Sequence, residues 1–211
     1  RRPLNGDGVT PYYFDFQNGC NAVNVTCALN DHIASTDSVT DGSDRLSILY
    51  DPPEDDDFDG NESTTCLGTE LTGMEEDVII NIYTIGTVGN INSLYCQGYN
   101  QTTATPIDAT AEPIIDGIDN MQILYGVTSS TDATGSVTKY ISQDKIVEDD
   151  WPLIRAVRVA LLVSNGLENG YADKKERKYR VLDSNEIKTG DTDRHARRIY
   201  STTVYLNNSR Y

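Results

Sequence analysis

Short apolar runs separated by polar turns dominate the pattern of this sequence. Leu46–Tyr50 is a short, mainly apolar run, and Val78–Tyr83 is apolar on nearly both faces. Both runs are typical of β-strands. Gly89 and Asn90 interrupt the second run, which resumes at Ile91–Cys96. The pattern predicts a hairpin whose two strands are joined by a loop of several residues.

The clearest alternation lies in the last third of the chain. Leu153–Val163 predicts the strongest strand, and one of its faces carries Val157, Val159, Leu161 and Val163. The other face carries small or basic side chains, which indicates partial cover. Arg198–Leu206 predicts the last strand, one face of which carries Tyr200, Thr202, Val204 and Leu206. We expect these two strands to lie in one antiparallel sheet.

Helical periodicity is weak throughout the chain. The best short case is Pro113–Asn120, where three isoleucines fall at helical spacing. Residues 1–19, 51–65 and 165–195 have the composition of loops. Because no helices separate the strands, the sheets should be antiparallel. The sequence therefore predicts an α+β, mostly β fold in a single domain over residues 1–211.

Charge is unevenly distributed along the chain, whose formal net charge is −16. Residues 1–138 carry 3 basic and 22 acidic side chains, whereas residues 139–211 carry 14 basic and 11 acidic ones. The overall sign argues against a nucleic-acid or anionic-membrane binder. No run approaches 18 consecutive apolar residues, so nothing predicts a membrane span. The two halves are either differently solvated surfaces or a dipolar module that docks with partners.

Catalytic motifs are nearly missing from the sequence. His32 and His195 both lie in polar surroundings, where a surface position is the ordinary interpretation. There is no dinucleotide-binding glycine motif, P-loop or zinc-protease motif. The cysteines form no paired zinc-ligand pattern. The basic run 174–180 fits an exposed hairpin better than a nucleic-acid patch. We expect a protein that is not an enzyme.

One acidic tract resembles half of a calcium-binding loop. Asp55, Asp57 and Asp59 stand at alternate positions before a glycine, which is how such loops begin to supply oxygen ligands. The closing glutamate of that motif would fall at position 66, which is Cys66. A solvated acidic loop and a calcium site both stay open, and the former fits better. Calcium is therefore a possible ligand and no cofactor is required.

Five segments in order resemble PilW-type minor pilins of bacterial type IV pili. They are Gly42–Tyr50, the pairing of Cys66–Gly68 with Ser93–Cys96, Ile115–Gly126, Ile154–Leu162 and Arg197–Asn208. The last three segments are also similar to the J-type minor pseudopilin of type II secretion, and the cysteine-bearing piece favours PilW. The resemblance defines a PilW-like β-rich region at 42–211. Residues 1–41 form a divergent N-terminal loop region.

The resemblance implies a structural subunit without catalysis. PilW-like proteins assemble with other minor pilins into a tip complex that primes pilus assembly. Their hydrophobic N-terminal transmembrane helix is absent from this chain, which would be the type IV pilin-like head. The implied location is the bacterial inner membrane and periplasm before assembly, and the extracellular pilus afterwards. No nucleic-acid partner is expected. The alternatives are a J-type pseudopilin and a secreted Ca²⁺-dependent adhesin.

Four cysteines allow three disulfide pairings, and their even number suits an oxidising compartment. We expect Cys66–Cys96, because Cys96 ends a strand that leads back from the Gly89–Asn90 turn toward the start of the preceding segment. We expect Cys20–Cys27, because the two residues lie close together in one polar loop and a local link is easily formed. A link of Cys20 to Cys66, or of Cys27 to Cys96, would contradict both.

Overall fold

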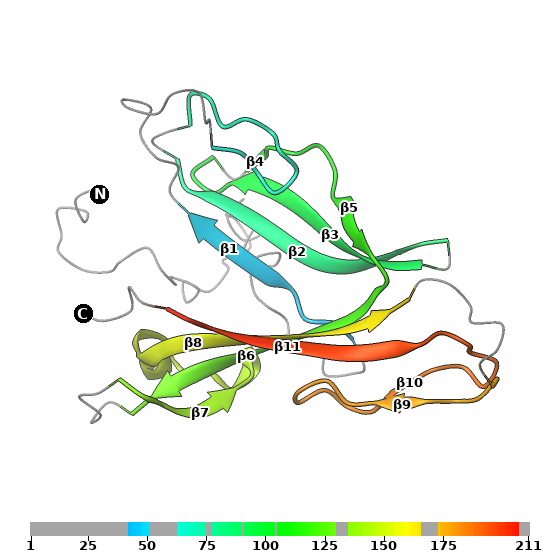
Figure 1. Ribbon diagram of the computed structural model, residues 1–211. Helices are drawn as coiled ribbons and strands as arrows, with labels where there is room; N and C mark the ends of the chain where they lie inside the picture. Colours follow the sequence, from blue (N-terminus) through cyan, green and yellow to red (C-terminus); the bar gives the residue numbers. More distant parts are fainter. Residues whose placement is uncertain are drawn as a thin grey trace, which may run out of the picture.

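The computed structural model describes residues 42–50, 63–74, 77–89, 91–103, 105–129, 135–165 and 173–206. Strands dominate these residues, and every paired strand is antiparallel to its neighbour. Two sheets lie one above the other, and a small two-stranded ribbon lies at one end of the lower sheet (Figure 1). The mostly β prediction is confirmed.

The first sheet contains β1 (Leu46–Tyr50), β2 (Ile79–Val88), β3 (Ile91–Asn100), β4 (Thr105–Pro106) and β5 (Glu112–Asp116). The second contains β6 (Ile118–Thr128), β7 (Val137–Ile141), β8 (Ile154–Ser164) and β11 (Arg197–Tyr205), in the spatial order β11-β8-β6-β7. The ribbon pairs β9 (Lys178–Tyr179) with β10 (Ile187–Lys188). Two short 3₁₀ helices precede β8: η1 (Gln143–Lys145) and η2 (Glu148–Leu153).

The hairpin predicted around Gly89 is present, but its turn is tighter than expected. Val88 pairs with Ile91, so two positions separate the strands and the expected loop of several residues is wrong. Gly89 has a φ of +64°, a backbone conformation that tight hairpin turns need and glycine adopts at little cost. The hairpin carries ten consecutive residue pairs, from Ile79–Asn100 to Val88–Ile91.

The pairing expected between the two strongest strands is confirmed. β8 and β11 are antiparallel over nine consecutive pairs, from Arg197–Ser164 to Tyr205–Ala156. Both strands begin and end within a residue of the predicted bounds. Regular alternation over nine or more positions is the strongest strand signal a sequence can carry.

The helical spacing at Pro113–Asn120 does not produce a helix. This segment forms the end of β5, a sheet-switching residue at Gly117 and the start of β6. Ile115 pairs with Leu94 of the first sheet, and Ile118 pairs with Val163 of the second. Gly117 has a φ of +79°, which an α-helix cannot contain. Pairing with two different sheets therefore overrides the helical spacing of the isoleucines.

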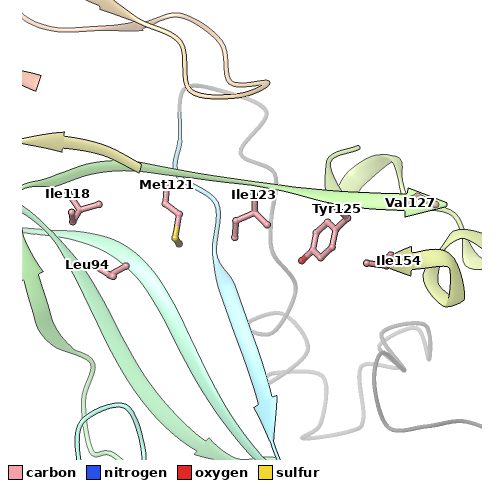
Figure 2. Packing of buried hydrophobic residues seen from close by; sticks show 7 residues of the cluster. All are labelled: Leu94, Ile118, Met121, Ile123, Tyr125, Val127 and Ile154. Atoms are coloured by element: carbon pink, nitrogen blue, oxygen red, sulfur yellow. The ribbon is translucent and has the colours of Figure 1, made fainter. Parts of the chain in front are cut away.

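The larger apolar core lies between the two sheets. Side chains of β6 point from the second sheet toward β1, β2 and β3 (Figure 2). Its buried members are Leu94, Ile118, Met121, Ile123, Tyr125, Val127 and Ile154. Half-buried residues of β8 pack against this cluster from the same face of the second sheet, and they are Val157, Val159, Leu161 and Val163.

A second, smaller core lies on the opposite face of β8. Ala160 and Leu162 are fully buried there against Val181, which lies beside β9. The segment 165–195 is therefore more than the expected loop, because the β9–β10 ribbon within it covers the small-residue face of β8. The ribbon thus provides the partial cover predicted for that face. β8 contributes one face to each core, so its apolar side chains fix the positions of both.

Gly117 joins the two sheets directly. Its N–H donates to the Asn92 carbonyl of β3 at 2.8 Å, and its carbonyl accepts from the Ser164 N–H of β8 at 2.7 Å. A Cβ atom at Gly117 would lie 2.6 Å from the Ser164 oxygen. Only glycine satisfies both the positive φ and this close approach.

A second junction lies where Ser43 and Asp44 meet β6. The Asp44 N–H donates to the Met121 carbonyl at 2.8 Å, and the Met121 N–H donates to Ser43 Oγ at 2.6 Å. The Ile123 N–H donates to the Asp44 carboxylate at 2.7 Å. The Gly42 carbonyl accepts from two buried side-chain amides of β6, those of Asn120 and Gln122. These bonds tie the chain entering β1 to the second sheet.

Among the helices in the described ranges, none has the length and apolar character needed to cross a bilayer.

Substituting Gly117 by alanine should destabilise the fold by at least about 2 kcal/mol, since the Cβ would combine positive-φ strain with a clash against Ser164. Gly73→Ala is the matched control, because Gly73 has a φ of +76° but open space around it. It should cost about 1 kcal/mol. Urea denaturation of both variants measures the difference. Equal losses would show that Gly117 does not join the sheets as described.

Candidate interaction surface

The predicted Cys66–Cys96 disulfide is present in the structure. It links the loop after residue 62 to the middle of β3, across 30 positions of sequence. The other predicted site residues lie outside the described residues, and their roles stay predictions. They are Cys20, Cys27, Asp55, Asp57 and Asp59. His32, for which a surface position is expected, also lies outside the described residues.

A buried carboxylate reinforces the disulfide region. Asp108 accepts the Gly98 N–H at 2.6 Å and the hydroxyl protons of Thr65 at 3.1 Å and Thr69 at 2.5 Å. Next to the disulfide, the Cys66 N–H donates to the Asn81 side chain at 3.1 Å. Because several donors surround it, the buried Asp108 carboxylate is a structural element rather than a reactive one. Sequence analysis missed it, since its partners lie 10 to 43 positions away.

At the opposite end of β3, an ion-pair network joins three parts of the chain. Asp119 is the extra residue of a β-bulge in β6, opposite the step from Val163 to Leu162. Bulges redirect side chains, and Asp119 accepts from the Asn92 amide at 3.1 Å and from Arg197 Nε at 2.5 Å. The bulge thus connects the first hairpin to the start of β11.

The network continues into the loop before β11. Arg197 also donates to the Asp193 carboxylate, which contacts His195 Nδ1 at 2.8 Å. Arg177, which precedes β9, donates to the Asp193 carbonyl at 2.9 Å. His195 is partly exposed, and its ring is hydrogen-bonded to the Asp193 carboxylate.

Electrostatics in this network favour the charged forms. Burial acts to raise the pKa of Asp193, but hydrogen bonds from His195 and Arg197 outweigh it and lower the pKa to about 2. Burial likewise acts to lower the pKa of Arg197, but its bonds to Asp119 and Asp193 raise it. The carboxylates of Asp119 and Asp193 pair with the side chain of Arg197, and these bonds stabilise the loop before β11. Among the described residues, no cluster of three or more histidine, cysteine or acidic side chains could hold a metal ion.

Among the described residues, exposed large apolar side chains occur on β11 and also around the β2–β3 turn and β5, but those of β11 adjoin the apolar face of β8. Tyr200 and Val204 are 53% and 54% exposed, on the face of the second sheet that also carries half-buried Val157, Val159 and Leu161. Ile199 and Tyr205 are exposed on the opposite face. Contiguous exposed apolar residues commonly mark protein interfaces. The β8–β11 half of the second sheet is therefore the candidate interaction surface.

Loss of the Cys66–Cys96 disulfide should lower the free energy of unfolding by about 3–4 kcal/mol, because the link closes a loop of roughly 30 residues in the unfolded chain. The double variant C66S/C96S should melt well below the wild-type protein, and a reducing agent should lower the wild-type melting temperature by a similar amount. Scanning calorimetry measures both. A reducing agent that lowers the melting temperature of the double variant equally would place the important disulfide elsewhere.

Asp193 should give the fold an acid-sensitive contribution. Its folded pKa of about 2 lies below the ordinary 3.8, so the stabilisation is present above about pH 4 and is lost as the pH falls toward 2. Asp193→Asn should cost about 1–2 kcal/mol at pH 7 and flatten the loss between pH 4 and 2. Asp191→Asn, at an exposed neighbour, is the control. Urea midpoints across this pH range would contradict the network if both variants kept the wild-type slope.

Comparison with protein families matches residues 82–208 to the family described as Type IV Pilus-assembly protein W. The matched range runs from within β2 to beyond β11, so it contains the whole second sheet and the candidate surface. The PilW resemblance found in the sequence is thereby confirmed over residues 82–208. No curated protein and no solved structure matches the chain. Since the matched range covers more than half of the 211 residues, the chain belongs to the PilW family of type IV pilus-assembly proteins.

Proposed function

We propose that this chain is the head of a minor pilin that assembles with other minor pilins into the tip complex that primes a type IV pilus. Its role is structural and involves no catalysis. Family membership supports a role in pilus assembly. The observation that carries the finer proposal is the apolar face of β8 and β11, which the rest of the described chain leaves partly open.

The open face is apolar along both β8 and β11, which suits contact with an apolar helix. The first sheet contacts the second mainly through β6, and half-buried aliphatic side chains of β8 continue the same face toward exposed Tyr200 and Val204. A hydrophobic helix preceding this sequence would cover that face. The helix would hold the subunit in the inner membrane before assembly and pack in the filament core afterwards. The head would then lie in the periplasm first and on the extracellular pilus later.

Charge supports side-by-side assembly with other subunits. The first 138 residues are strongly acidic and the remaining 73 are slightly basic. Subunits carrying opposed patches attract one another at close range and approach in a preferred orientation. Such steering suits a complex in which several different heads must pack in a fixed order.

Val159→Asp in the full-length protein should abolish piliation, since it places a charge in the apolar face that the helix would cover. Val147→Asp is the control, because Val147 is 61% exposed in the loop between the two 3₁₀ helices. Surface pili are counted by electron microscopy, and purified heads are tested for co-purification with the other minor pilins of the same operon. The proposal fails if the wild-type head binds none of them and Val159→Asp still supports normal piliation.

A further inference from the structure

The outer edge of β11 offers a row of backbone hydrogen-bonding groups. The Asn165 N–H donates to the Ala196 carbonyl at 3.1 Å, and the Leu206 N–H donates to the Arg155 carbonyl at 2.8 Å. Bonds in an antiparallel pair alternate, so even-numbered residues of β11 bond to β8. The backbone groups that point away from β8 belong to Ile199, Ser201, Thr203 and Tyr205. Within the described ranges, β11 pairs with β8 alone.

This edge lacks the features that normally protect a free strand. Edge strands are usually short, bulged, interrupted by proline or guarded by charges. β11 keeps nine residue pairs with β8 without a register shift, and from Ile199 to Tyr205 it has no proline and no charged side chain. Such an edge can accept another strand through main-chain bonds. Its exposed aromatic and aliphatic side chains would flank the added strand on both faces.

Charge selects the kind of strand that fits. β8 and β11 together carry four arginines and no carboxylate, in a chain whose net charge is −16. One of the four, Arg197, is already paired with Asp119 and Asp193. Arg198 is exposed at the start of β11, and its guanidinium lies over the ring of Tyr200. Arg158 donates to Thr203, but its guanidinium lies over Tyr140 of β7, at the other side of the sheet. A second copy of this chain would bring the same arginines and the same excess of negative charge. An acidic strand from a different protein is attracted to this edge instead.

We propose that the outer edge of β11 binds an extended, acidic segment of another pilus subunit, which extends the second sheet by one strand. This inference rests on the proposed function and specifies how the head contacts its neighbour. The added strand bonds to the outward groups of Ile199, Ser201, Thr203 and Tyr205. Its acidic side chains lie near Arg198, and its apolar side chains contact Tyr200 and Val204.

Substitutions at Ser201 separate the backbone requirement from the side chain. Ser201→Pro removes an outward N–H while leaving the bonds of Thr202 to β8, whereas Ser201→Ala keeps that N–H. Binding to the purified heads of the operon's other minor pilins is measured by calorimetry. We expect Ser201→Pro to weaken binding by roughly 10-fold or more and Ser201→Ala to change it by less than about 3-fold. Ser201→Glu should weaken binding and Ser201→Lys should not.

Hydrogen exchange of the wild-type head gives a readout that does not depend on the variants folding. The amides of Ile199, Ser201, Thr203 and Tyr205 should exchange quickly in the isolated head and become protected in the complex. Protection of these amides in the isolated head would overturn the proposal, because the edge would already be occupied. So would wild-type affinity of a folded Ser201→Pro variant, which would leave the proposed function standing. If the wild-type head binds no other minor-pilin head, both the proposed function and the strand-addition proposal fail.

Discussion

The placement of the two sheets relative to each other depends on which groups hydrogen-bond to the β6 backbone along the edge that faces away from β8. β7 pairs with β6 only from Tyr125 onward, so the backbone groups of the preceding β6 residues on this edge need other partners. Ser43 and the buried carboxylate of Asp44 supply them by bonding the main chain at Met121 and Ile123. A buried carboxylate is costly unless donors surround it. Here the bond from the Ile123 N–H to the Asp44 carboxylate also attaches the chain entering β1 to the second sheet.

This attachment determines which surfaces remain open. The first sheet lies over β6, where Met121, Ile123 and Tyr125 fill the space between the sheets (Figure 2). β8 and β11 extend beyond it, with the ribbon covering the opposite face of β8. The apolar face and the outer edge of β11 are therefore available together. Gly117 and the Asp119–Arg197 pair keep β11 in this position relative to the first hairpin.

The sequence predicted the parts of this fold that depend on local pattern. The long alternations of β8 and β11 located both strands, and the Gly89 turn located the hairpin that carries Cys96 and hence the disulfide. Sequence analysis failed where contacts between residues far apart in the chain determine the structure. Three isoleucines at helical spacing are divided between two sheets by Gly117, and the short ribbon around Val181 has no strong periodicity.

The polar sites were beyond prediction for the same reason. Asp44 bonds to a residue 79 positions away, Asp119 to one 78 positions away, and Asp108 to Thr65 across 43 positions. Each is an ordinary aspartate in the sequence, and only the folded chain brings its donors together. The candidate surface was partly predictable, because the apolar face of β8 was visible in the alternation while the exposure of Tyr200 and Val204 was not.

Immunogold electron microscopy of the protein on intact cells tests the central claim most directly. An antibody against the head should label the tips of type IV pili, with little label along their shafts, because a priming complex is carried outward ahead of the growing filament. Label spread over the cell surface and absent from the filaments would contradict a role at the pilus tip.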